Sequence, residues 1–210
     1  MALRLSGGRR LQSPKGEVAR PTTGRVRAAV MNMLADRLGD CSWLELCGGS
    51  GVMACEVLQR GAAVVVLVEK DRRVATVARA NLELVVAAQT TAGVRQPQVK
   101  VVEEEALRFL RRGVASSGYK PFNLIYADPP WASGLHGPLA EAVMAGGWLA
   151  PGGVMVWEAM KGSGLQIPMG WREQRRRAYG TSELVILALG EDQWKEDEAL
   201  PRNTEEGLHP

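Results

Sequence analysis

The segment Asp128–Trp131 places a carboxylate, two prolines and an aromatic ring directly after the apolar run at 122–127. An amino group attached to a base ring is a poor nucleophile, because its lone pair is delocalised into the ring. The Asp128 carboxylate and the Pro129 carbonyl can accept hydrogen bonds from the two N–H groups of such an amine, and the prolines make the turn rigid. Trp131 offers a ring face on which the base can stack. We therefore predict that Asp128, Pro129, Pro130 and Trp131 position an exocyclic base nitrogen for methylation.

Three glycines, Gly48, Gly49 and Gly51, follow the short apolar segment at 43–47. Glycine allows a positive φ and lets the backbone approach a ligand closely. The next apolar run ends at Glu69, where a carboxylate can accept hydrogen bonds from ribose hydroxyls. Together these features predict a cofactor that contains a nucleoside.

Glu45 favours S-adenosylmethionine over a dinucleotide as the cofactor. Residues 49–54 also match the G-x-G-x-x-A form of the dinucleotide fingerprint, which leaves an NAD-dependent oxidoreductase as an alternative. A carboxylate just before the turn is unfavourable beside a pyrophosphate but favourable near the sulfonium and ammonium groups of S-adenosylmethionine. We therefore expect S-adenosylmethionine as the cofactor.

The amine-binding segment also fits a methyltransferase that acts on adenine N6 or cytosine N4 in DNA. Against this function, no separate region for reading a DNA sequence is evident. The basic N-terminal segment would also suit a non-catalytic RNA-binding module. Both functions stay open on the residues alone.

From residue 42 onward, short apolar runs alternate with helical patterns, as in a parallel sheet covered by helices. We expect strands at 43–47, 63–69, 99–103, 122–127 and 154–158. We expect helices at 52–60, 72–88, 106–112 and 139–149, preceded by an amphipathic helix at 23–37 that Thr22 or Thr23 caps. The segments at 171–179 and 183–189 are expected to pair as an antiparallel hairpin. The fold class is therefore α/β, with a domain at 23–190.

The two ends of the chain carry opposite charge. Residues 1–30 contain seven arginine or lysine residues against Glu17 alone, so we expect residues 1–22 to be a basic arm, either in contact with an RNA backbone or solvated. Residues 191–210 are acidic and lack an apolar period, and we expect a disordered tail. Because no apolar run reaches the length of a membrane span and no secretory signal is evident, we expect a cytoplasmic protein. Nothing demands a dimer, so we expect a monomer.

Several remaining polar residues are expected to carry no chemistry. The three cysteines, Cys41, Cys47 and Cys55, have spacings unlike those of zinc sites, so we expect buried thiols and no metal. His136 is expected to lie in an exposed loop. Four arginines are expected to lie on the solvated face of an edge strand: Arg172, Arg175, Arg176 and Arg177.

The chain resembles the bacterial 16S rRNA guanine-N2 methyltransferases, the RsmD-like family of class I methyltransferases. The resemblance spans about residues 4–190, and its most particular stretch is Arg-Pro-Thr-Thr-Gly-Arg-Val-Arg at 20–27. Further matches are the segments at 60–62, 68–71, 106–110, 128–131, 149–153 and 177–180. The sequence departs from the family pattern at Gly24, which replaces Asp, at Glu105, which also replaces Asp, and in a shorter N-terminal stretch at 7–10.

The resemblance implies a Rossmann-like, mostly parallel seven-stranded sheet with helices on both faces and a C-terminal antiparallel hairpin. It implies transfer of a methyl group to the N2 of a guanine in small-subunit rRNA or in an assembling small subunit. With the glycine turn, it implies that S-adenosylmethionine binds to Glu45, Cys47, Gly48, Gly49, Gly51, Glu69, Lys70, Glu105 and Ala106. It implies RNA contacts from Arg9, Arg10, Arg20, Thr22, Thr23, Arg25 and Arg27.

Overall fold

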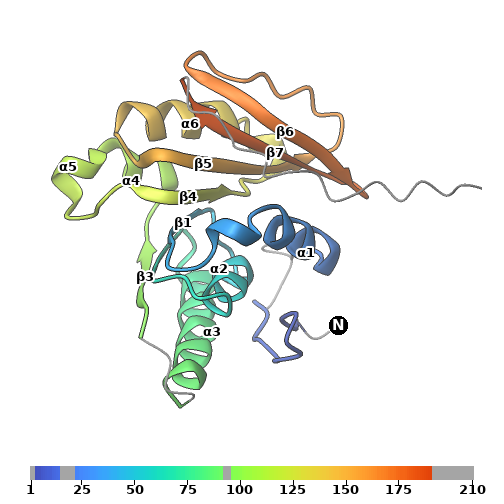
Figure 1. The fold of residues 1–210 in the computed structure, drawn as a ribbon, viewed down its shortest axis with the longest axis vertical. Helices are drawn as coiled ribbons and strands as arrows, with labels where there is room; N and C mark the ends of the chain where they lie inside the picture. Colours follow the sequence, from blue (N-terminus) through green and yellow to red (C-terminus); the bar gives the residue numbers. More distant parts are fainter. Residues whose placement is uncertain (1–2, 15–21, 92–95, 191–210) are drawn as a thin grey trace, which may run out of the picture.

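Seven strands form one mixed sheet in the computed structural model, which describes residues 3–14, 22–91 and 96–190 (Figure 1). The strand order is β3-β2-β1-β4-β5-β7-β6. The first five of these are parallel, and β7 runs antiparallel to both β5 and β6. The strands are β1 (Ser42–Leu46), β2 (Val64–Glu69), β3 (Gln98–Glu103), β4 (Phe122–Ala127), β5 (Leu149–Met160), β6 (Trp171–Tyr179) and β7 (Ser182–Leu189). The predicted fold class is confirmed.

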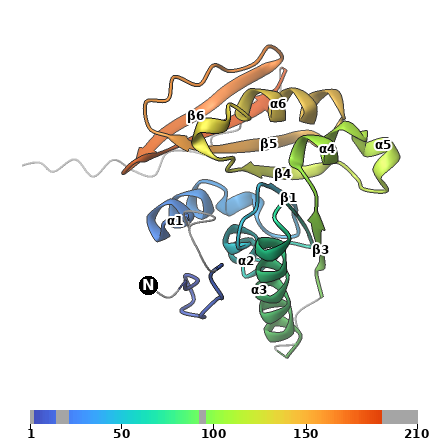
Figure 2. The same ribbon diagram turned by 180° about the vertical axis from the view of Figure 1, so that it is seen from behind.

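Helices cover both faces of this sheet (Figures 1 and 2). One face packs against α1 (Gly24–Met33), α2 (Val52–Leu58) and α3 (Arg72–Thr91). The other packs against α4 (Ala106–Arg111) and α6 (His136–Ala145), with the short α5 (Gly113–Ser117) beside them. Successive strand residues point to opposite faces, so Trp43 belongs to the first apolar cluster and Leu44 to the second. Two 3-10 turns, η1 (Ala35–Arg37) and η2 (Trp131–Ser133), complete the elements. None of the helices in the described ranges is long and apolar enough to cross a membrane.

The helix predicted at 139–149 was wrong at both ends. It begins earlier, at His136, and ends at Ala145. Gly147 has a φ of +65°, a backbone conformation that does not continue a helix, and Trp148 is fully buried against α4. Residues 151–153 were predicted to follow the helix, but they lie inside β5, where the register shifts against β4. A continuous apolar run does not by itself distinguish a buried helix end from the strand that follows.

Residues 3–11 form a small hairpin that packs on the α2 and α3 side of the molecule (Figure 2). Arg4 and Arg10 form an antiparallel bridge, and the amide of Leu11 donates to the carbonyl of Leu3. Leu3, Leu5 and Leu11 are buried in the first apolar cluster. The backbone of this stretch is therefore packed on the domain, whereas the side chains of Arg4 and Arg10 are exposed, and both interpretations of the basic arm stay open. The predicted acidic tail at 191–210 lies outside the described residues.

Candidate active site

A cavity of about 510 Å³ opens at the carboxyl ends of the parallel strands, the edge at which open α/β sheets bind ligands. It brings together twelve of the thirteen predicted catalytic and cofactor residues. Those in its wall are Glu45, Cys47, Gly48, Gly49, Glu69, Lys70, Glu105, Ala106, Asp128, Pro129, Pro130 and Trp131. Thr22 and Thr23 also line it. Segments separated by more than eighty residues therefore share one site.

Each glycine of the turn between β1 and α2 is required for a different physical reason. A side chain at Gly48 would place its Cβ 2.4 Å from Cγ of Leu67, so only glycine fits against β2. Gly49 has a φ of +54°, and no atom lies within 4 Å of the position of a Cβ there. Gly51 has a φ of +75° and packs closely against Ala78 of α3. Gly51 is the one predicted cofactor residue that does not line the cavity, so its positive φ and its packing account for the glycine here, and its cofactor contact stays a prediction.

Glu69 is held in place by two backbone amides. Its carboxylate accepts hydrogen bonds from the amide of Gly49 at 3.0 Å and from that of Asp71 at 2.8 Å. These bonds fix the side chain at the end of β2, in the cavity wall. A carboxylate fixed in this way suits the hydroxyls of a ribose.

Glu45 is a buried carboxyl group in the middle of the site. Only 2% of the residue is exposed, and it accepts a hydrogen bond from Nε1 of Trp43. Burial raises the pKa of Glu45 to about 8 although the bond from Trp43 opposes the shift. The group therefore becomes a carboxylate at neutral pH only beside a positive charge. This fits a sulfonium or ammonium group and does not fit a pyrophosphate.

Asp128 and Glu158 are neighbours at the ends of two adjacent strands. The last registered pair of β4 and β5 is Ala127 with Trp157, and the two acidic residues come next on each strand. Burial, followed by the charges of Glu158 and Glu45, raises the pKa of Asp128 well above its ordinary range. Asp128 thus holds its proton readily, and a nearby cation or hydrogen-bond donor favours its ionisation.

Glu158 is a site residue that the sequence patterns did not reveal. It is buried, lines the cavity, and accepts hydrogen bonds from the hydroxyls of Tyr126 and Ser182. Tyr126 in turn stacks on Trp43, with ring centroids 5.7 Å apart. The position of Glu158 near the carboxyl end of an apolar segment is a local signal that it shares with Glu69 and Asp128, but this signal does not reveal its contacts with Tyr126 and Ser182.

Glu105 has a structural role besides its place in the cavity. It is the N-cap of α4, and its carboxylate accepts from the amides of Leu107 and Arg108. Cys47, with a φ of +60°, lies in the turn, and burial raises its thiol pKa to about 12. The thiol is therefore neutral and contributes shape rather than a nucleophile.

Some of the residues predicted to contact RNA are exposed, whereas others are bound within the protein. Arg9 is partly exposed, and Arg10 and Arg25 are exposed. Thr23 caps α1 by accepting from the amide of Val26 at 3.3 Å. Arg20 lies outside the described residues.

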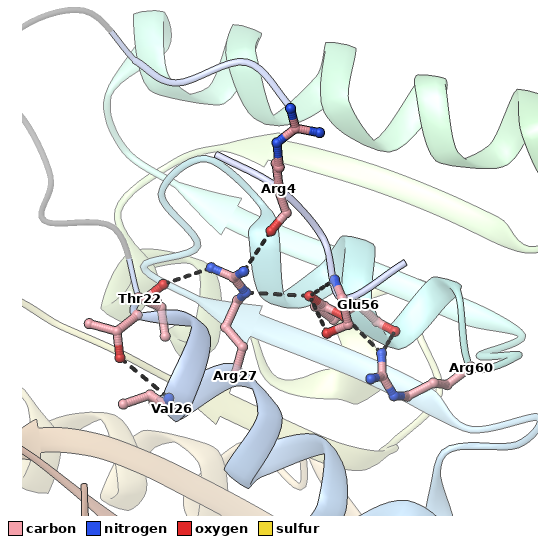
Figure 3. A network of polar contacts seen from close by, with 8 residues as sticks. Arg4, Thr22, Val26, Arg27, Glu56 and Arg60 are labelled. Carbon is pink, nitrogen blue, oxygen red and sulfur yellow. Dashed lines mark hydrogen bonds and ion pairs between the residues drawn. The ribbon is translucent and has the colours of Figure 1, made fainter. Parts of the chain in front are cut away.

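Arg27 does not fit the predicted RNA contact, because its guanidinium is bound within the protein (Figure 3). It donates to the carbonyls of Thr22 at 3.0 Å and Arg4 at 2.6 Å, and it lies 3.4 Å from the carboxylate of Glu56. Glu56 is fully buried and also binds Arg60 at 2.8 Å and the amide of Ser6 at 2.9 Å. Burial alone would raise the pKa of Glu56, but the bonds from Arg60 and Ser6 outweigh it and lower the pKa. This network fastens the hairpin at 3–11 and the start of α1 to α2.

Two further predictions need correction or refinement. His136 was predicted to be exposed in a loop, but it is the first residue of α6 and is buried, with Nε2 2.9 Å from the carbonyl of Glu158. Burial lowers its pKa. The arginines of β6 do lie on an edge strand, where Arg176 binds Glu173 and Glu183.

The fold and the cavity define this protein as a class I methyltransferase of the Rossmann-like type. Its structure is similar to that of a putative methyltransferase, yhhF, from Escherichia coli, with a TM-score of 0.71 and 30% identity over 92% of this chain and 100% of that one. The fold is shared with an RNA methyltransferase from Salinibacter ruber, solved in complex with S-adenosyl-L-homocysteine, at a TM-score of 0.58 and 15% identity over 85% of this chain and 100% of that one.

The chain belongs to the family described as Conserved hypothetical protein 95, whose model matches residues 5–188. It is 33% identical to the Ribosomal RNA small subunit methyltransferase D of Escherichia coli (strain K12) over 174 residues, which are 82% of this chain and 81% of that protein. It is 27% identical to the protein of the same name from Haemophilus influenzae over 82% of this chain and 84% of that one.

Proposed function

We propose that this protein transfers a methyl group from S-adenosylmethionine to the exocyclic N2 of a guanine in small-subunit rRNA. One observation carries the proposal: a single cavity joins the amine-acceptor segment at Asp128 to the glycine turn, Glu45 and Glu69. The names of the family relatives support an rRNA substrate and methyl transfer. The choice of guanine N2 rests on the resemblance at residues 20–27.

Residues on β1 and β2 bind the cofactor in this proposal. Glu69, already fixed by the amides of Gly49 and Asp71, accepts from the ribose hydroxyls. Glu45 ionises beside the positive charges of the methionine portion, which offset the cost of its burial. Glu105 and Ala106, at the start of α4, lie on the wall next to Glu69 on the adjacent strand. When bound, S-adenosylmethionine supplies the electrophilic methyl group.

Residues 128–131 bind the amine. Asp128 and the carbonyl of Pro129 accept its two N–H groups, which localises the lone pair on nitrogen and directs it away from these acceptors. Trp131, in the η2 turn, stacks on the base. Asp128 is also placed to take up the proton that the nitrogen loses after methylation, because its raised pKa favours the protonated form.

Arg9, Arg10 and Arg25 bind the RNA backbone in this proposal, with Thr22 and Thr23 at the mouth of the cavity. Backbone contacts of this kind supply affinity and position rather than sequence choice. The hairpin at 3–11 is fastened by Glu56 and Arg27, so Arg9 and Arg10 are carried by a segment that packs on the domain. We place the reaction in the cytoplasm and propose that a monomer carries it out.

The direct test uses S-adenosylmethionine with a labelled methyl group. Unmethylated small subunits, their naked rRNA and duplex DNA are each incubated with the protein, and the products are digested to nucleosides. The proposal expects label in N2-methylguanosine. Label in N6-methyladenine or N4-methylcytosine of DNA would instead support the DNA methyltransferase.

Calorimetry separates the remaining classes. Tight binding of S-adenosylhomocysteine and none of NADH is expected, whereas the reverse would support the oxidoreductase. Cofactor binding without turnover on any nucleic acid would support a non-catalytic RNA-binding module.

A further inference from the structure

Two carboxyl groups, Asp128 and Glu158, face the same part of the cavity. Asp128 directly follows β4 and Glu158 lies beside it within β5, and both point to the same face of the sheet as Tyr126 and Glu45. The amine needs acceptors from Asp128 and Pro129 only. Glu158 is therefore a buried acidic group in the substrate cavity that the proposed methyl transfer does not use.

The surroundings of Glu158 hold it in a fixed position as an acceptor. The Tyr126 hydroxyl donates to one carboxylate oxygen, and the Ser182 hydroxyl donates to the other at 2.9 Å. Both carboxyl oxygens are therefore oriented by donors from the two strands that flank β5.

The bases that carry an exocyclic amine differ at the ring nitrogen beside it. In guanine the amino group lies between N1, which bears a hydrogen, and N3, which does not, so N1–H and the N2 amino group are adjacent donors. In adenine and cytosine the ring nitrogen beside the amine is an acceptor. A fixed carboxylate next to the amine site therefore attracts N1–H of guanine and repels the lone pair on the ring nitrogen of adenine or cytosine.

We propose that Glu158 is a specificity-determining residue that accepts a hydrogen bond from N1–H of the target guanine while Asp128 binds its amine. This inference rests on the proposed function. Tyr126 and Ser182 are positioning residues, because they orient the carboxylate. The site then selects guanine by the donor at N1 rather than by the amine that all three bases share.

The test compares guanosine with 2-aminopurine riboside, which keeps the 2-amino group but has an acceptor at N1. The methylated position is first located by mass spectrometry of the product formed by the wild-type protein. The rRNA is then rebuilt by ligation around a synthetic segment that carries either nucleoside at that position. Methyl transfer is measured, and binding without cofactor is followed by 2-aminopurine fluorescence.

Glu158→Gln is the informative variant, because its amide N–H can donate to an acceptor at N1. The wild-type protein is expected to prefer guanosine by about 100-fold or more, and Glu158→Gln is expected to reverse or abolish this preference and to bind the 2-aminopurine RNA more tightly. Glu173→Gln, an exposed carboxyl on β6 outside the cavity wall, is the matched control and should behave as wild type.

The outcomes separate this inference from the proposed function. Equal use of both nucleosides by the wild-type protein would overturn the role of Glu158, whether or not the variant folds. An unchanged preference in a folded Glu158→Gln that still binds S-adenosylhomocysteine would do the same. A wild-type protein that forms no N2-methylguanosine would overturn the proposed function, and the inference with it.

Discussion

The guanidinium of Arg27 lies 3.4 Å from the carboxylate of Glu56, and both side chains are largely buried. This ion pair sits between α1 and α2 and extends to Arg4 and Ser6 of the hairpin at 3–11. The hairpin contributes Leu3 to the cavity wall. The position of a terminal segment, and with it one wall of the site, therefore depends on a buried carboxylate in α2.

Replacing Glu56 should loosen this hairpin. Glu56→Ala leaves Arg27 without its anion, and we expect a loss of about 3 kcal/mol in the free energy of unfolding, at the lower end for a broken buried pair because Arg60 can turn to solvent. Denaturant unfolding measures the loss. Limited trypsin digestion should also cut after Arg4, Arg9 or Arg10 faster than in wild type. Glu83→Ala, an exposed carboxyl on α3, should change neither; equal digestion of both variants would contradict the fastening role.

The arginines proposed to bind RNA should act through salt-sensitive contacts. Arg9→Gln, Arg10→Gln and Arg25→Gln are each expected to weaken rRNA binding and to lower the slope of log affinity against log salt by about 1. Filter binding across a series of salt concentrations measures both. Arg111→Gln, at the end of α4 on the other face of the sheet, is the matched control. Slopes equal to that of wild type in all three variants would remove these residues from the RNA surface.

Asp128 should matter for turnover and not for cofactor binding. Asp128→Ala removes an acceptor for the amine, and we expect methyl transfer to fall by about 10²- to 10³-fold, as when one preorganised hydrogen-bonding group is lost from an active site. Binding of S-adenosylhomocysteine should stay within about twofold of wild type. Glu141→Ala, an exposed position on α6, is the control. Transfer by Asp128→Ala at the wild-type rate would disprove the catalytic assignment.

The buried Glu45 should make cofactor binding depend on pH. Since burial raises its pKa to about 8, the group is protonated at pH 6–7 in the ligand-free protein and must lose a proton to face a cation. Affinity for S-adenosylhomocysteine, which keeps the ammonium group but lacks the sulfonium, is therefore expected to rise with pH up to about 8. Calorimetry at several pH values should show a weaker dependence in Glu45→Gln.

The same group affects stability with a defined sign. Its pKa is higher in the folded protein than the ordinary 4.5, so the folded state binds more protons between these values. Its contribution to stability is full below about 4.5 and is lost as pH rises toward 8, at up to about 1.4 kcal/mol per pH unit. Wild type should lose stability across this window relative to Glu45→Gln. If the free energy of unfolding changed with pH in the same way in both proteins, Glu45 would not have the raised pKa.

The parts of the site that follow from local patterns were predictable from the sequence. Asp128–Trp131 and the glycine turn each come directly after a strand whose apolar run is unambiguous, and strand ends of a parallel sheet lie at one edge. Glu69 was found for the same reason. The structure brings them together in one cavity, while their roles stay predictions.

The parts that depend on distant contacts were not predictable. Glu158 joins the site through Tyr126 and Ser182, which come from β4 and the C-terminal hairpin. Arg27 lies in a basic segment, and its charge suggested RNA because nothing local reveals a buried partner 29 residues away. His136 was misplaced because its burial depends on packing against Trp157.

The cavity wall includes Leu3 near one end of the described chain and Ser182 near the other. During synthesis Leu3 is made well before Ser182, so the segment that carries it exists before its neighbours across the cavity. Fragments that lack β7, such as those left by premature termination, should therefore have no complete substrate site. The cavity is therefore completed only when β7 pairs with β5 and brings Ser182 to its wall.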